Sequence, residues 1–119
     1  MPRKKNNWVP DRGNIIWIDF NPQSGRDMHP LLVLSPLKFN ERTGIVIGLP
    51  MTTAEYNNTN PFAIQFKGKR GVVSYVLTHQ PKSFDWRQRG AKIHPWKHAP
   101  VEILTEACEL LNQIITLTD

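Results

Sequence analysis

The 119-residue sequence predicts a small, strongly bent antiparallel sheet or barrel with one helix packed on it at the C-terminus. Short segments rich in β-branched and aromatic residues recur through most of the chain, separated by Pro, Gly and Asn turns. One amphipathic segment with helical spacing follows them. The 39% hydrophobic content is enough for one modest core. We therefore expect a single mainly β domain over residues 12–119, after a basic, partly disordered arm at residues 1–11.

The first two predicted strands are residues 15–20 and 31–35, and a polar loop joins them. Their apolar and aromatic side chains suit a largely buried pleated surface. The loop carries Arg26, Asp27 and His29. Three ionisable groups between two stiff strands could carry chemistry, or could form an ordinary solvated hairpin loop.

The next elements alternate between turns and strands. We expect a turn or short helix at residues 37–43 and a third strand at residues 45–49. Residues 62–66 alternate apolar and polar side chains, the period-2 pattern of a half-buried strand. Residues 72–78 are the expected hairpin partner of that strand.

A short edge strand is expected to begin residues 80–86, and the basic, aromatic residues 87–100 are predicted to be irregular. A helix then starts at Pro100, with glutamates in its first half that suit the helix dipole. Its apolar face must be buried against the sheet or a second subunit, so we expect a homodimer. That face consists of Ile103, Ala107, Leu110 and Ile114.

Charge and cysteine content narrow the class of protein. The net charge is +5, and no Lys or Arg follows Lys97, although four of the ten acidic residues do. A basic body favours a polyanionic partner such as nucleic acid. Cys108 is the single cysteine, which fits a reducing compartment. Without a secretion signal or a run of about 18 apolar residues, we expect a cytoplasmic protein that does not contact a membrane.

The sequence contains no pattern that we expect to bind a metal or a cofactor. His79, His94 and His98 lack the spacing of a zinc site, and there is no phosphate-binding glycine loop or nucleophile elbow. Metal-free RNA cleavage remains open, because the ribose 2′-hydroxyl is itself the nucleophile. The protein then needs a base, an acid and a cation near the phosphate.

Several residues fit those roles. His29 could transfer a proton near neutral pH, and Arg26 could bind phosphate oxygens through two N–H groups. Thr52 and Thr53 could donate hydrogen bonds to phosphate, or could only end a strand. The aromatic residues that could stack on unpaired bases, or instead belong to the core, are Phe20, Trp86 and Trp96.

Four motifs follow one another between about Arg12 and Ile115: RGNIIWIDFNP, HPLLVLSPLKFN, GLPMTT and HQPKSFDWRQRGAKI. Together they resemble the MazF/PemK family of toxin endoribonucleases, the mRNA interferases. The resemblance implies an SH3-like barrel that forms a homodimer and cleaves single-stranded RNA at short sequences without a metal. It also implies inhibition by an antitoxin with an acidic, flexible C-terminal segment, with operator DNA bound only through that antitoxin.

The resemblance also implies site residues. Thr52 matches the catalytic threonine of the family, but the loop is shorter and ends in His29-Pro30 where the family usually has Arg-Pro. Either His29 takes the acid–base role, or Arg26 reaches the same space, or activity has been lost. Four residues match family positions near bound RNA: Phe20, Thr53, Gln80 and Lys82. We also expect Asn21, Trp86 and Arg87 to contact RNA.

Two other functions stay open at this stage. A non-catalytic toxin of the same fold could inhibit a protein target such as DNA gyrase, which fits the missing Arg-Pro. A plain nucleic-acid-binding barrel would also explain the basic charge and the aromatic residues.

Overall fold

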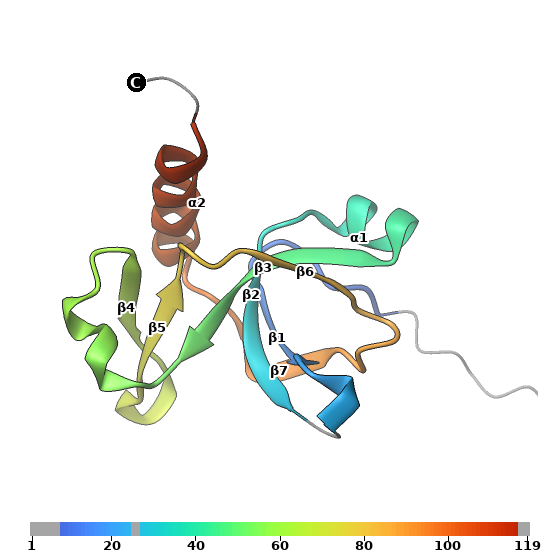
Figure 1. Cartoon of the computed structure of the whole chain (residues 1–119), viewed down its shortest axis with the longest axis horizontal. Coiled ribbons are helices and arrows are strands. Elements are labelled where there is room, and N and C mark those ends of the chain that lie inside the picture. The colour runs from blue at the N-terminus through green and yellow to red at the C-terminus, as the bar shows by residue number, and fades with distance from the viewer. Residues whose placement is uncertain (1–7, 25–26, 117–119) are drawn as a thin grey trace, which may run out of the picture.

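The computed structural model describes residues 8–24 and 27–116. Their strands are β1 (Asn14–Asp19), β2 (Met28–Val33), β3 (Ile45–Thr52), β4 (Ala63–Lys67), β5 (Val73–Leu77), β6 (Lys82–Asp85) and β7 (Lys92–His98). The helices are α1 (Leu37–Thr43) and α2 (Val101–Ile115), with short 3-10 turns at Pro22–Ser24, Glu55–Thr59 and Lys69–Gly71. The strands form one curled sheet in the order β4-β5-β3-β2-β1-β7, and β6 pairs with β3 (Figure 1). The predicted bent sheet with a C-terminal helix is confirmed.

The sheet bends at β3, which pairs with three other strands. Its first half pairs with β6, its middle with β2, and its last residues with β5. The prediction that this strand ends at residue 49 is wrong, because the ladder continues through Pro50 to Thr52. Proline lacks only the N–H donor, so a strand can pass through it where that donor is not needed.

Residues 87–100, predicted to be irregular, contain β7, which pairs antiparallel with β1. For example, Ile93 lies opposite Ile16. The register shifts along this ladder, and Lys97 has a φ of 65°, so a bulge interrupts the alternation of side chains. With Pro95 inside the strand, the bulge removes the period-2 pattern by which strands are predicted.

Two apolar clusters fill the two faces of the curled sheet. The first contains Ile15, Leu32, Leu49, Met51, Ile64, Phe66 and Val76. The second contains Ile16, Ile18, Leu31, Val33, Val46, Phe84 and Trp86. Successive residues of β1 and β2 fall in different clusters because side chains alternate across a strand.

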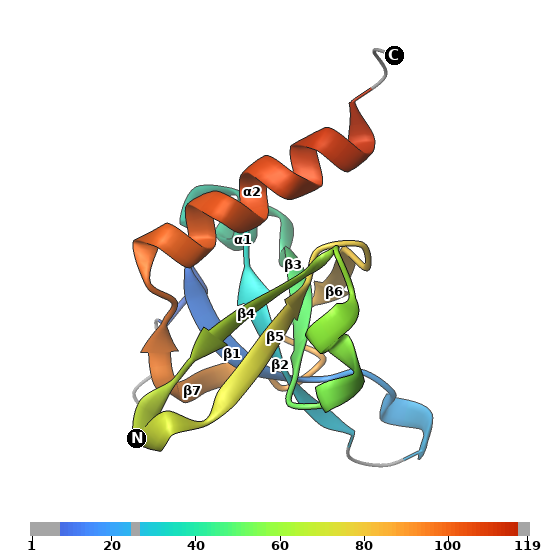
Figure 2. The same ribbon diagram turned by 90° about the vertical axis from the view of Figure 1, so that its left-hand side faces the viewer.

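Helix α2 covers the first cluster and packs across β4 (Figure 2). Ala107 is fully buried, and Ile103 and Leu110 pack against the cluster, so most of the predicted apolar face is confirmed. Ile114 and Ile115 at its end remain 40% and 61% exposed. Among the described residues, no helix is long and apolar enough to cross a membrane.

Part of the predicted N-terminal arm is packed. Pro10 is fully buried, and its carbonyl accepts a hydrogen bond from the Asn40 side-chain amide at 2.7 Å. Trp8 packs edge-on against Trp86, with ring centroids 6.2 Å apart. The prediction of partial disorder is therefore wrong for residues 8–10, while residues 1–7 lie outside the described part of the chain.

Candidate active site

A cavity of about 460 Å³ opens in the curled sheet. The end of β3 and the start of β5 lie on one side of it, and residues of β1, β2 and β7 lie on the other. We call it the tryptophan–histidine cavity. Its lining residues are Trp17, His29, Pro30, Met51, Thr52, Thr53, Val72, Ser74, His94 and Trp96. It brings the predicted His29, Thr52 and Thr53 together with Trp17 and His94, to which no role was predicted from the sequence.

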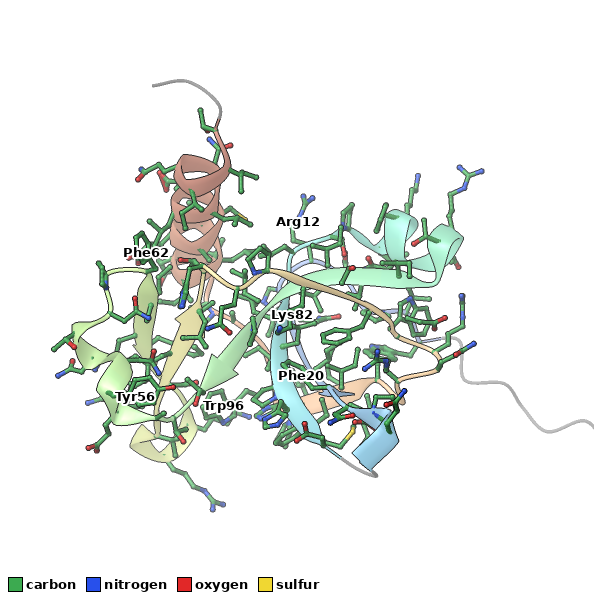
Figure 3. All side chains as sticks on the ribbon, viewed as in Figure 1. Arg12, Phe20, Tyr56, Phe62, Lys82 and Trp96 are labelled. Carbon is green, nitrogen blue, oxygen red and sulfur yellow. The ribbon has the colours of Figure 1, made fainter. Side chains whose placement is uncertain are left out.

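Three aromatic rings form one wall of the cavity. The His94 ring lies 4.7 Å from Trp17 and 5.2 Å from Trp96, measured between ring centroids. Trp96 lies between β5 and β2 in Figure 3 and packs edge-on against Phe66 of β4. It also touches Gly68, where an added Cβ would come within 2.4 Å of the indole. The wall therefore joins β7 to the β4–β5 hairpin, and only glycine permits this close approach.

The protonation state of His94 follows from its neighbours. The backbone N–H of Trp96 donates to Nδ1 of His94 at 3.0 Å, so Nδ1 carries no proton. Burial lowers the pKa of His94 from its usual value of 6.5, so the ring is neutral at pH 7. The proton of the neutral ring is then on Nε2, which is a hydrogen-bond donor.

Thr52 is the last residue of β3 and is half-buried opposite Tyr75. Its Oγ1 accepts a hydrogen bond from the Ala54 backbone N–H at 3.1 Å, and the hydroxyl proton can donate to another acceptor. Thr53 is exposed and also borders a second cavity of about 550 Å³. The other residues of that second cavity are Glu55, Asn58, Gln65, Val73 and Tyr75.

His29 lies in a strand and not in the loop that was predicted to carry it. Strand β2 begins at Met28, three residues before the predicted boundary, because its pairing with β1 continues to the edge of the loop. His29 is opposite Ile18, and Pro30 is opposite Trp17. Because side chains alternate, His29 points to the face of the sheet opposite to Trp17 and borders the cavity from its edge.

A hydrogen bond to Asp27 holds the His29 ring. Its Nε2 is 2.7 Å from Oδ1 of Asp27, with 49% of the histidine side chain and 42% of the aspartate side chain exposed. A carboxylate only accepts hydrogen bonds, so Nε2 carries the proton and Nδ1 of the neutral ring can accept one. Asp27 is itself placed by its backbone N–H, which donates to the Asp19 side chain at 3.1 Å.

Phe20 connects His29 to the second apolar cluster. Its ring lies 5.0 Å from His29 and 4.9 Å from Phe84. The Arg89 guanidinium, which was not predicted to lie here, is 5.2 Å from the Phe84 ring and donates to the Asp19 carbonyl. Only the register of β7 and the turn before it brings this cation beside β1, so no local pattern could have identified it.

The other predicted site residues are dispersed. Lys82 of β6 is exposed and lies two residues before Phe84, whose ring packs against Phe20, so Lys82 and Phe20 share one face of the sheet. Asn21 and Gln80 are also exposed. None of the three lines the tryptophan–histidine cavity. Arg26 lies outside the described residues.

The prediction that Trp86 stacks on bases is wrong for this structure. Trp86 is only 7% exposed, and its indole N–H donates to the Asn40 carbonyl at 2.8 Å. The Arg87 guanidinium covers the ring at 4.4 Å and donates to the Glu41 carbonyl of α1. Arg87 is exposed beside α1 and does not line the cavity.

The arrangement supplies a proton acceptor at His29, hydroxyl groups at Thr52 and Thr53, and a neutral imidazole donor at His94. Within residues 8–24 and 27–116, no group of three His, Cys, Asp or Glu side chains could hold a metal ion. Such groups can transfer a proton and donate hydrogen bonds to phosphate oxygens.

The chain is similar to members of a known toxin family. Residues 11–115 match the family described as PemK-like, MazF-like toxin of type II toxin-antitoxin system. The endoribonuclease toxin MazF of Escherichia coli strain K12 is 39% identical over 89 residues, covering 71% of this chain and 76% of that protein.

Solved structures agree with this match. MazF from Deinococcus radiodurans has a TM-score of 0.80 and 32% identity, over 93% of this chain and 100% of that chain. A MazE-MazF structure from the same organism has a TM-score of 0.78 and 32% identity, over 94% and 100%. An endoribonuclease in complex with its cognate antitoxin, from a Mycobacterial species, shares only 16% identity and supports the fold alone, with a TM-score of 0.68.

Proposed function

The chain belongs to the PemK-like, MazF-like toxin family of type II toxin–antitoxin systems, and we propose that it is an endoribonuclease that cleaves single-stranded RNA at short sequences without a metal ion. The endoribonuclease activity named for the relative that is 39% identical supports the reaction class. The observation that carries the proposal is the cavity that both His29 and Thr52 border. In this proposal His29, at the edge of the cavity, is the proton acceptor, and the Thr52 hydroxyl is the hydrogen-bond donor.

The proposed reaction uses the ribose 2′-hydroxyl as the nucleophile. Nδ1 of His29 accepts the proton of that hydroxyl as its oxygen attacks the adjacent phosphorus. The bond from phosphorus to the 5′-oxygen breaks, and this oxygen takes a proton from solvent. The products are a 2′,3′-cyclic phosphate and a 5′-hydroxyl.

Negative charge on the phosphorane must be stabilised as it develops. In this proposal the Thr52 hydroxyl donates to one non-bridging oxygen, and Arg26 binds phosphate oxygens through its guanidinium. Asp27 holds the His29 ring and stabilises the imidazolium that forms when Nδ1 takes the proton.

Bound RNA is proposed to extend from the cavity over the exposed side of β2 and β6. Phe20 offers a partly exposed ring, and Lys82 offers an exposed cation two residues before Phe84, against which the Phe20 ring packs. The remaining proposed contacts are Asn21, Thr53, Gln80 and Arg87, all of which are exposed. The net charge of +5 favours a polyanion along this path.

We also propose a cytoplasmic homodimer that binds an antitoxin with an acidic, flexible C-terminal segment, and that reaches operator DNA only through it. The exposed end of α2 supports the dimer, because Phe62, Leu110 and Ile114 line an open cavity of about 430 Å³ there. A purified protein that sediments only as a monomer at micromolar concentration would contradict the dimer.

The test of the activity is incubation of the purified protein with a long RNA in EDTA. We expect cleavage at a short recurring sequence, with 2′,3′-cyclic phosphate ends. If the folded protein leaves the RNA intact, the replacement of the family arginine by His29 instead favours a non-catalytic toxin. Inhibition of DNA gyrase would then separate that toxin from a plain nucleic-acid-binding barrel.

A further inference from the structure

We propose that the tryptophan–histidine cavity binds one nucleobase, and that the Nε2–H of His94 donates a hydrogen bond to an acceptor on the edge of that base. His94 would thereby set the base preference at one position beside the cleaved bond. This inference rests on the proposed function, because the base belongs to the RNA that is cleaved.

The shape and surface of the cavity suit a planar heterocycle. Its volume of about 460 Å³ lies within the range of roughly 300–1,000 Å³ that is usual for small-molecule sites. Trp17 and Trp96 give it aromatic walls, and the buried Met51 gives it an apolar floor. Unpaired bases are bound by stacking on such side chains.

The hydrogen-bonding character of His94 is fixed before any ligand arrives. Its Nδ1 is occupied by the Trp96 backbone N–H, and its ring is held between Trp17 and Trp96. Nε2–H therefore remains a donor in one orientation. A single fixed donor favours a base that presents a carbonyl oxygen or an unprotonated ring nitrogen over one that presents an amino group.

The position of the cavity relates the base to the reaction. Thr52 and Thr53 line it together with His94, and Thr52 is proposed to bind the phosphate that reacts. His29 borders the same cavity from its edge. A base held against His94 therefore belongs to a nucleotide next to the scissile phosphate.

An acidic antitoxin segment is the competing occupant. Exposed Lys92 and Lys97 of β7 would attract any polyanion, so charge near the cavity does not decide between the two. The residues that line the cavity distinguish the two occupants, because none of the described lining residues is Lys or Arg. Aromatic walls and a neutral donor suit a base better than a carboxylate, which requires a cation or several N–H donors.

The test compares wild type with His94→Phe, which keeps an aromatic ring and removes the donor. RNAs that differ in one base at each position around the cleaved bond are used as substrates. At one position we expect the preference in kcat/KM to fall by about ten- to a hundredfold. His94→Gln, which keeps an N–H donor, should restore part of it, and His98→Phe on the same strand is the matched control. An unchanged preference in folded His94→Phe would overturn the proposal.

A binding measurement separates this proposal from the proposed function. The same RNAs with a 2′-deoxyribose at the cleavage position cannot react, and their affinities are measured by titration calorimetry. A base preference that His94→Phe abolishes supports the site even if wild type cleaves no RNA. If His94→Phe weakens only an acidic antitoxin peptide and leaves RNA binding unchanged, the cavity is a peptide site and the proposal is wrong.

Discussion

The two histidines beside the cavity differ in which ring nitrogen is occupied. His29 is about half exposed and directs Nε2 to the Asp27 carboxylate, which leaves Nδ1 as an acceptor. His94 is half-buried and receives a backbone N–H at Nδ1, which leaves Nε2–H as a donor. Two identical side chains on neighbouring parts of one sheet are thus prepared for opposite roles. His29 suits proton transfer and His94 suits recognition.

The largest effect is expected from His29→Ala. Loss of the proton acceptor should lower the rate of cleavage by about 10²–10⁴-fold on every RNA sequence. The reason is that proton transfer to His29 does not depend on which nucleobase is bound. Single-turnover cleavage of one RNA measures it, with His98→Ala as the matched control. Full activity in folded His29→Ala would exclude this residue from the reaction.

A smaller loss is expected from Asp27→Asn. An amide can still accept the proton of His29 Nε2, but it cannot stabilise the imidazolium by charge. Because both side chains are about half exposed, solvent screens the pair, and we expect a loss of about tenfold. The difference from wild type should shrink when cleavage is measured at higher salt. A loss that is independent of salt would indicate a structural role for Asp27.

The wall around His94 can be disturbed without changing either histidine. Gly68→Ala would place a Cβ within 2.4 Å of the Trp96 indole, and overpacking of this kind costs about 1–3 kcal/mol in the free energy of unfolding. Denaturant unfolding measures this cost. In the double variant Gly68→Ala/Trp96→Phe the smaller ring should relieve the contact, so additive losses would contradict the packing described.

The smallest effect is expected in how the free energy of unfolding depends on pH through His94. Since burial lowers the pKa of His94, the unfolded chain binds a proton first as the pH falls through 6.5. The folded protein therefore loses stability from about that pH downwards, until the lower pKa of the folded state is passed. The free energy of unfolding of wild type minus that of His94→Phe should decrease over this range. A difference that is constant from pH 8 to pH 5 would contradict the shift.

The contrast between the histidines also shows what could be predicted from the sequence. Turn residues and β-branched runs are local signals, so the first two strands and the candidates His29 and Thr52 could be found. The role of His94 could not be predicted, because it depends on the contact of β7 with Trp17. A bulge and Pro95 remove the sequence pattern by which β7 could have been predicted.

Trp86 shows that the sequence can also suggest a binding role for a residue that the fold buries. Its sequence context, between Asp85 and Arg87, suggests an accessible aromatic residue beside a cation. Its indole instead donates to a carbonyl of Asn40, 46 residues earlier in the chain. Burial of one aromatic side chain depends on such distant partners, which local composition does not reveal.

The pH–rate profile of cleavage tests the division of roles most directly. We predict that the rate for wild type changes with pH between about 5 and 8, as expected for a histidine that transfers a proton. His94→Phe should keep that dependence on its best substrate, and the residual activity of His29→Ala should lose it. A profile that becomes flat in His94→Phe and is preserved in His29→Ala would show that the roles assigned to the two histidines are wrong.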